Sequence, residues 1–293
     1  MKNHISVFYG QEKAINEKFF LLCREECKLL TRLLEHKENL IQQLGGKIKD
    51  TDTPDYSIEL MLSYNLSLFN SSLTNLSNGY LGVSQIILRV ALENTCLAMY
   101  FYEFPDDEKK YRKNRKSFSC KLKTLGYGYW IEGWLKRIDK EGTKFTKLKG
   151  EKGVWYQRIF NNMVEEANLF VHVDVDFIYS LVFMKSDKEK SQYALGPNWS
   201  SDLLVKNALW KIIEACLYDC AVLDRVFKKH LAIIDMNLFE KVCDLLNEWK
   251  KYYNSQTKKL NDQRSIKDKV ANPSTSVESN ATGKKVEGIV RRR

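Results

Sequence analysis

The chain has 293 residues, a formal net charge of +10, and 44% hydrophobic and 12% aromatic residues. This is enough apolar material for a folded core, which excludes a wholly disordered chain. Only 14 glycines and 4 prolines occur, too few for the many turns of a β-sandwich or barrel.

The N-terminal residues show no positively charged segment followed by an apolar stretch, so no signal peptide is predicted. The best membrane-spanning candidate, Tyr80 to Tyr102, carries Arg89 and Glu93 near its middle, and we expect no transmembrane helix. The 7 cysteines are an odd number, which fits reduced thiols in the cytoplasm.

Apolar residues at three- and four-residue steps predict helices over most of the chain. The first expected helix ends at Gly45 and Gly46, the second at Asn78-Gly79 and the third at Pro105, because these residues commonly stop helices. The expected helices span residues 11–44, 57–77, 80–104, 152–169, 201–231 and 236–253.

Two segments carry most of the basic excess. Residues 105–150 hold 14 Lys/Arg against 6 Asp/Glu, and we interpret them as a basic insertion of short helices and loops. From residue 254 onward the apolar content collapses, while 10 Lys/Arg stand against 4 Asp/Glu. We therefore predict a helical domain over 1–253 and a disordered basic tail over 254–293.

Residues 171–195 break the helical rhythm. Their first part, VHVDVDF, alternates apolar and polar residues as a strand does. The apolar runs FIYSLVFM and SQYAL flank the polar turn KSDKEK, which predicts a β-hairpin. The expected fold class is mainly α, a helical bundle with a small β-hairpin near residues 171–195.

The third predicted helix carries a narrow polar stripe in an apolar frame. Arg89 and Glu93 lie one turn apart in it and can reach each other. The pair is either a structural contact that fixes the register of the bundle, or a site where Arg89 binds an anion or a phosphate and Glu93 acts as a base or orients a histidine. A solvent-exposed stripe is the third alternative. The stripe consists of Gln85, Arg89, Glu93, Cys96, Tyr100 and Glu103.

His172 lies where the helical rhythm gives way to alternation. In an extended segment it shares a face with Asp174 and Asp176. An imidazole beside a carboxylate can act near neutral pH, so His172 is a candidate catalytic or ligand-binding residue. A solvent-facing strand is the alternative, and three residues on one strand rarely complete a metal site.

Three short segments resemble a group of uncharacterised bacterial helical proteins. They are Arg89-Val-Ala-Leu-Glu93-Asn94, Asn168-Leu-Phe-Val-His172 and Leu195-Gly-Pro-Asn-Trp199. The group is similar to the HEPN-like (higher eukaryote and prokaryote nucleotide-binding) domains, and the resemblance covers residues 58–230. Many HEPN-like domains cleave RNA in toxin–antitoxin and antiphage systems, and they often dimerise. The resemblance therefore implies RNA and a second copy of the chain as partners.

HEPN ribonucleases carry an arginine and a histidine separated by roughly four to six residues, a short motif that also arises by chance. Arg225-Val-Phe-Lys-Lys-His230 is the match in this chain, although Val226 stands where that family prefers a polar residue. The resemblance implies that His230 moves the 2′-hydroxyl proton while Arg225 holds the phosphate. Alternatively, the basic residues that end this helix only complement its dipole.

Residues 109–125 hold eight Lys/Arg and no acidic residue, with Tyr111 and Phe118 among them. Such a patch can bind phosphate backbones, and a merely solvated surface is the alternative. The candidate nucleic-acid-binding residues are Lys109, Lys110, Arg112, Lys113, Arg115 and Lys116.

Two cysteine pairs, Cys23 with Cys27 and Cys216 with Cys220, each lie one helical turn apart. Facing helices would let them bind zinc, but structural zinc sites usually use Cys-x-x-Cys knuckles, so we favour core packing. The chain lacks phosphate-binding, dinucleotide and hydrolase motifs. We expect neither a metal nor a cofactor.

The sequence predicts an RNA-directed helical protein of bacterial defence or stress-response type, with metal-independent ribonuclease activity as its enzymatic form. The alternative is a non-catalytic scaffold or sensor subunit that binds partner proteins, and we expect a cytoplasmic protein without a membrane partner. The candidate catalytic residues are Arg89, Glu93, His172, Arg225 and His230.

Overall fold

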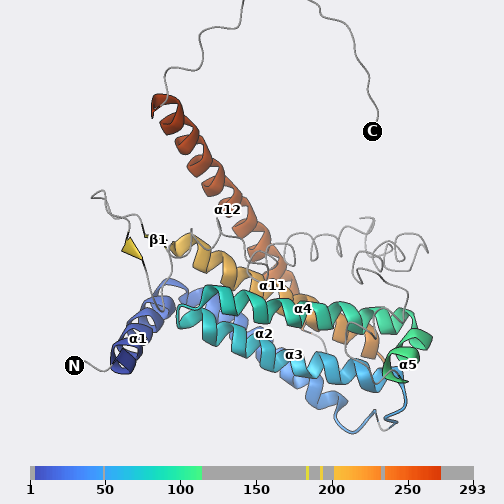
Figure 1. The fold of residues 1–293 in the computed structure, drawn as a ribbon. Helices are drawn as coiled ribbons and strands as arrows, with labels where there is room; N and C mark the ends of the chain where they lie inside the picture. The colour runs from blue at the N-terminus through green and yellow to red at the C-terminus, as the bar shows by residue number, and fades with distance from the viewer. Residues whose placement is uncertain are drawn as a thin grey trace, which may run out of the picture. The chain divides into compact units, whose positions relative to one another are not determined.

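The computed structural model describes residues 4–48, 50–113, 183–184, 192–193, 201–231 and 235–271. These residues are mainly helical, which confirms the predicted fold class at that level (Figure 1). The chain separates into two units, Met1–Leu246 and Asn247–Arg293. The helices are α1 (His4–Leu22), α2 (Arg24–Leu44), α3 (Pro54–Ser77), α4 (Leu81–Glu103), α5 (Pro105–Lys113), α11 (Asp202–Phe227) and α12 (Met236–Ala271).

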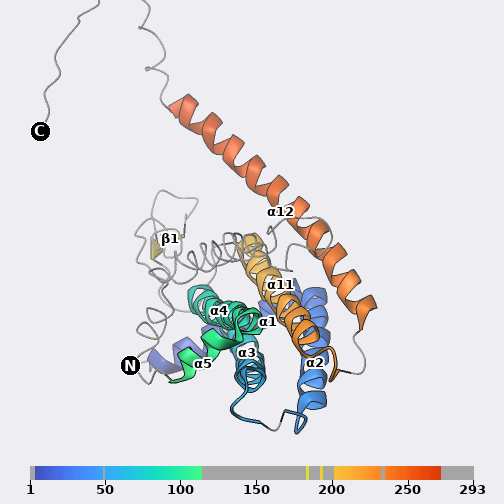
Figure 2. The ribbon, with the colours of Figure 1, turned by 90° about the vertical axis from the view of Figure 1, so that its right-hand side faces the viewer.

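Helices α2, α3, α4 and α11 pack together as a four-helix bundle (Figure 2). Short connections make α2 and α4 antiparallel to α3. The ion pairs Glu26–Lys206 and Lys37–Asp219 join α2 to α11 in the same chain order, so α11 runs parallel to α2. Short connections join antiparallel neighbours, so the parallel packing of α11 against α2 needs the long connection that separates α4 from α11 in the sequence.

Local chemistry explains where these helices begin and end. Gly46 after α2 has φ +76°, and Gly79 between α3 and α4 has φ +90°, a backbone region that glycine adopts without steric cost. Pro54 occupies the first turn of α3, where its missing N–H has no helical partner to lose. The turns that pack α3 against its two neighbours are therefore encoded locally.

The core consists of apolar side chains contributed by every helix of the bundle. Phe69 of α3, Phe101 of α4 and Phe227 of α11 are almost wholly buried. Fully burying one such side chain contributes about 1.5–3 kcal/mol. Hydrophobic burial is therefore the main force that holds the four helices together.

Two predicted element boundaries differ from the structure. The single helix expected over 11–44 is divided at Cys23, whose backbone (φ −115°, ψ 27°) leaves helical geometry between α1 and α2. The disordered tail expected from residue 254 is helical as far as Ala271. No glycine or proline interrupts residues 254–271, so nothing in the backbone chemistry ends α12 earlier, although the segment is polar.

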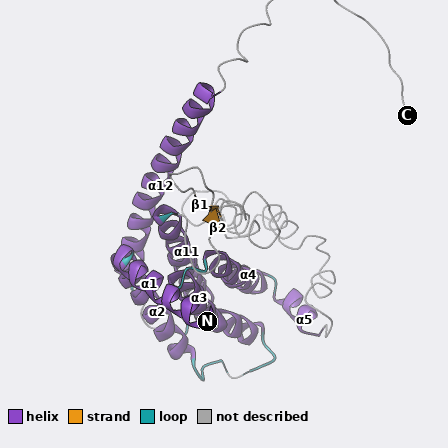
Figure 3. Cartoon of the chain, turned by 60° about the vertical axis from the view of Figure 1, so that its left-hand side comes forward, coloured by secondary structure: helices purple, strands orange, loops and turns teal. Residues whose placement is uncertain are grey.

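The two strands in the described part are β1 (Phe183–Met184) and β2 (Gln192–Tyr193), which pair antiparallel (Figure 3). Two-residue strands do not establish the hairpin predicted for 171–195, most of which lies outside the described residues. The helix predicted over 152–169 also lies outside them. Both stay predictions.

Among the described helices, α4 alone is long and apolar enough to cross a membrane by length and composition. Residues 60–88 carry no charged side chain, but the Asn78-Gly79 turn divides them between α3 and α4. Core helices of soluble proteins pass the same test, and α4 packs against α3 and α11. The length and composition of α4 are therefore only weak evidence for a membrane-spanning helix.

Candidate functional site

The polar stripe of α4 contains the first pair of predicted catalytic residues. Arg89 Nε lies 2.8 Å from Glu93 Oε1, and the two side chains are 21% and 19% exposed. The predicted pair therefore forms, but within one helix, where it cannot fix the register between helices. A contact between two helices occurs instead at the end of the stripe, where Arg225 Nη2 of α11 lies 3.4 Å from Glu103 Oε1 of α4.

Parts of this stripe have incomplete hydrogen bonding. Arg89 Nη1 and Gln85 Nε2 are buried donors without an acceptor in the described part of the chain. Burial raises the pKa of the Glu93 carboxyl, and Arg89 opposes this effect. A donor that lacks an acceptor beside a carboxyl that is easier to protonate can bind an anion or move a proton.

The other predicted catalytic residues occupy separate places. His172 lies outside the described residues, so its approach to Arg89 stays a prediction. Arg225 is used in the ion pair with Glu103. His230 is exposed beyond the end of α11, where its carbonyl oxygen accepts a 2.7 Å hydrogen bond from Lys47 Nζ.

Three basic residues of α5, Lys109, Lys110 and Arg112, pair with nearby acidic residues. Arg112 donates from Nε to Glu108 Oε1 at 2.8 Å and from its Nη atoms to backbone oxygens of residues 51–52 at 2.8 and 2.6 Å. Lys109 and Lys110 each pair with an aspartate three residues earlier, at 3.7 and 3.0 Å. This part of the predicted nucleic-acid surface is largely neutralised. Of the remaining candidates, Lys113 is exposed, and Arg115 and Lys116 lie outside the described residues.

The sequence did not predict the polar network at the centre of the bundle. Lys37 of α2 and Asp219 of α11 form a fully buried ion pair, and Lys37 Nζ also donates to Leu62 O at 2.6 Å. Asn65 of α3 and Thr95 of α4 donate to Asp219 Oδ1, each at 2.6 Å. Each helix of the bundle therefore supplies at least one member of the network.

A buried ion pair is tolerated only where further hydrogen bonds offset the loss of hydration, and this network supplies them. Its signal was present in the sequence, because Lys37 occupies a position where the helical pattern calls for an apolar residue. Its neighbours in that pattern are Leu30, Leu33, Leu40 and Leu44, all fully buried. The network's partners, spread over four helices, give it a structural role.

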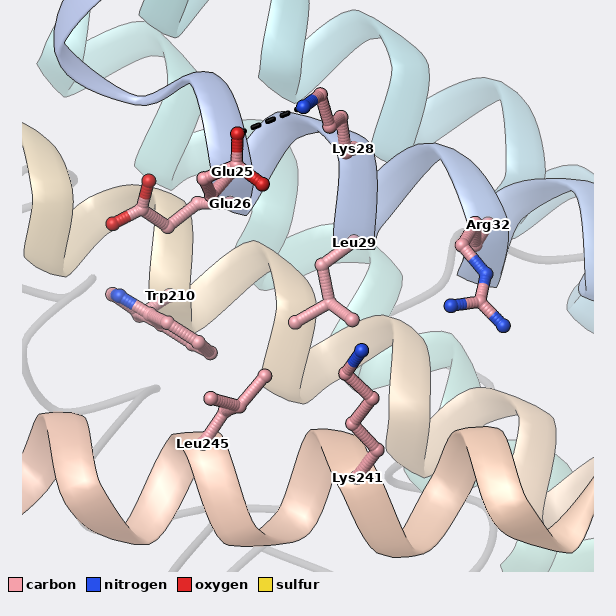
Figure 4. Close-up of a pocket in the computed structure, with 8 residues that line it drawn as sticks. All are labelled: Glu25, Glu26, Lys28, Leu29, Arg32, Trp210, Lys241 and Leu245. Atoms are coloured by element: carbon pink, nitrogen blue, oxygen red, sulfur yellow. Dashed lines mark hydrogen bonds and ion pairs between the residues drawn. The ribbon is translucent and has the colours of Figure 1, made fainter.

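A pocket of about 500 Å³ lies between α2, α11 and the first part of α12 (Figure 4). Leu29, Trp210 and Leu245, one from each helix, form its apolar wall, and Trp210 is only 7% exposed. Binding sites for small molecules have this character, a largely apolar wall with a few polar groups.

The acidic side chains of the pocket form ion pairs, whereas two of its basic side chains do not in the described part of the chain. Glu25 pairs with Lys28 at 2.8 Å, and Glu26 pairs with Lys206 at 3.2 Å. The two acidic side chains are therefore neutralised. Two basic side chains of the lining have no partner within the described ranges, namely Arg32 and Lys241.

The predicted preference for core packing of the cysteines agrees with their surroundings. Lys206 acts electrostatically on Cys23, and Cys216 follows Lys206 by ten residues, a rise of about 15 Å along α11. Burial raises the pKa of Cys23 to about 12 and that of Cys27 to about 11, so both thiols stay protonated at neutral pH. The described residues contain no group of three potential metal ligands.

No protein-family model, curated protein or solved structure matches this chain. The resemblance to HEPN-like domains therefore stays a prediction, and the function is inferred from the geometry of the site.

Proposed function

We propose that this protein is a non-catalytic scaffold or sensor subunit that binds a ligand or partner through the pocket between α2, α11 and α12. The carrying observation is the pocket itself, which joins an apolar wall to two basic side chains that lack a partner among the described residues. By contrast, Arg89 and Arg225 already hold ion pairs inside the protein. We therefore assign recognition to the pocket and its two cations, Arg32 and Lys241.

The remaining predictions belong to the same proposal. The β-hairpin over 171–195 is a small addition to the helical body, and the protein works in the cytoplasm with reduced thiols. The expected partners are RNA, a second copy of the chain or another protein. These features follow from the sequence patterns and the HEPN-like resemblance.

Thermal unfolding in the presence of a chemically diverse fragment set tests this function. Fragments that bind the pocket should raise the Tm of the wild type and have little effect on a Trp210→Leu variant. Each protein is compared with its own ligand-free form, so a lower Tm of the variant does not obscure the result. Tyr64→Leu, which removes an exposed aromatic residue of α3, is the control. A set without any Trp210-dependent binder contradicts the proposal.

A metal-independent ribonuclease is the second candidate. It is favoured by the buried Arg89 Nη1, which has no acceptor among the described residues, and by the raised pKa of Glu93, caused by burial. The arginine would hold a phosphate oxygen and the carboxyl would transfer a proton.

Incubation of cellular RNA with wild-type and variant protein in the presence of a chelator tests this candidate on a denaturing gel. Cleavage that Arg89→Ala or His172→Ala abolishes would support an enzyme that uses the predicted site of Arg89, Glu93 and His172. Cleavage lost only in Arg225→Ala or His230→Ala would place the chemistry at the end of α11. Intact RNA in every lane is the result expected for a scaffold or sensor.

A further inference from the structure

The charge balance of the pocket between α2, α11 and α12 defines one property of its ligand. Glu25 and Glu26 are paired with lysines, so they contribute little net charge. Arg32 and Lys241 remain as the two basic side chains of the lining without a partner in the described part of the chain. A complementary ligand therefore carries a negative group.

The arrangement of the side chains gives a second property. Figure 4 shows Leu29 and Leu245 in the middle of the pocket, with Trp210 on one side of them and Arg32 on the other. The Lys241 side chain rises from α12 between Leu245 and Arg32. The ligand consequently needs an apolar body toward the indole and its charge at the opposite end.

The size of the pocket limits the ligand further. About 500 Å³ falls within the range of roughly 300–1,000 Å³ typical of sites for small molecules. An aromatic ring adds a favourable contact with an indole face or edge. A planar guanidinium binds a carboxylate through two parallel hydrogen bonds.

From these properties we infer that the pocket binds a small organic acid with an aromatic or other apolar body. Its ring lies against Trp210 and the two leucines, and its carboxylate lies between Arg32 and Lys241. This inference rests on the proposed function, because it specifies the ligand of the same pocket.

Isothermal titration calorimetry with two matched probes tests the inference. Naphthalene-2-carboxylate and 2-naphthylmethanol share one ring system, and only the first carries a charge. The carboxylate should bind about tenfold more tightly, and this preference should fall as salt is added, because both cations are exposed.

The double variant Arg32→Gln/Lys241→Gln should remove the preference and leave the affinity for the alcohol unchanged. Both positions are on the surface, so the variant should fold normally. Lys113→Gln, which removes an exposed charge on α5 outside the pocket, is the matched control and should retain the wild-type preference.

The outcomes separate this inference from the function on which it rests. Equal binding of both probes, or a preference for the carboxylate that survives in the double variant, contradicts the inference that the ligand is an organic acid. Neither result contradicts the proposed binding function of the pocket. If both probes fail to bind while a neutral fragment binds in a Trp210-dependent way, the organic-acid inference is likewise wrong and the binding function is supported. If both probes and every fragment fail to bind, the inference and the proposed function are both wrong. If an acidic peptide binds and naphthalene-2-carboxylate does not, the ligand is a segment of a protein and the inference of a small molecule is wrong.

Discussion

Helix α4 carries polar side chains of two kinds, only six residues apart. Thr95 faces the interior and donates to the Asp219 carboxylate, which also accepts from Asn65 and Lys37. Arg89 lies on the stripe, about one-fifth exposed, with one nitrogen paired and another lacking an acceptor in the described part. Thr95 is part of the architecture, whereas Arg89 can still donate a hydrogen bond to an acceptor from outside.

The difference follows from how many helices supply partners. Four helices converge on Asp219, so the ordering of these groups is shared by the whole bundle. The Arg89–Glu93 pair comes from one helix, so the spacing of four residues within α4 is enough to bring its two side chains together. Polar groups that look alike in the sequence therefore differ in what their loss would cost.

The largest expected effect concerns the interior network. Lys37→Met leaves the Asp219 carboxylate buried without its cation and should lower the free energy of unfolding by about 3–5 kcal/mol. Urea unfolding followed by circular dichroism measures this loss. In the double variant Lys37→Met/Asp219→Leu no buried charge remains, and the loss should be smaller than in the single variant. A larger loss in the double variant would show that the pair itself is strongly stabilising.

An intermediate effect is expected at α5, where one partner is buried and the other is partly exposed. Glu108 is fully buried and accepts from Arg112 at 2.8 Å and from Ser57 at 2.6 Å. Arg112→Gln removes the cation and should cost about 1–3 kcal/mol of unfolding free energy. Urea unfolding measures it, with Lys109→Gln as the exposed control, expected to change stability by about 0.5 kcal/mol or less. Equal stability of both variants would mean that Glu108 is adequately hydrated without its arginine.

The smallest effect is expected from the pH dependence of the α4 stripe. Because burial raises the pKa of Glu93 above its ordinary 4.5, the folded protein binds this proton more tightly than the unfolded chain does. Stability attributable to Glu93 is therefore greatest below pH 4.5 and declines as the pH rises through the folded-state pKa. Glu93→Gln should remove this decline.

Urea unfolding of both proteins at a series of pH values from 4.5 to neutral measures the difference. The variant should gain stability relative to the wild type as the pH increases. Parallel curves would show that Arg89 fully offsets the burial of the carboxyl.

The sequence predicted the helices best where a repeating apolar face ends at a glycine or proline. Helices α3 and α4 begin and end within about three residues of prediction, in the usual uncertainty of helix ends. The division at Cys23 was missed because the apolar repeat continues across it. The helical part of the tail was missed because a polar composition predicts disorder but does not itself break a helix.

The candidate site was predictable in part for the same reason. The Arg89–Glu93 pair follows from a spacing of four residues on one helix. The pairing of Arg225 with Glu103 could not be predicted, because it joins residues 122 positions apart. The pocket combines three helices, and no single segment carries a pattern that marks it.

The sequence by itself determined α3, α4, the turns around them and the Arg89–Glu93 pair, because each depends on side chains within about one or two turns of the same segment. Only the tertiary structure decided that Lys37 meets Asp219 and that Leu29, Trp210 and Leu245 line one pocket. The network depends on how four helices are oriented against one another, and the pocket on how three are. That orientation is set by the burial of the whole core rather than by any one of its segments.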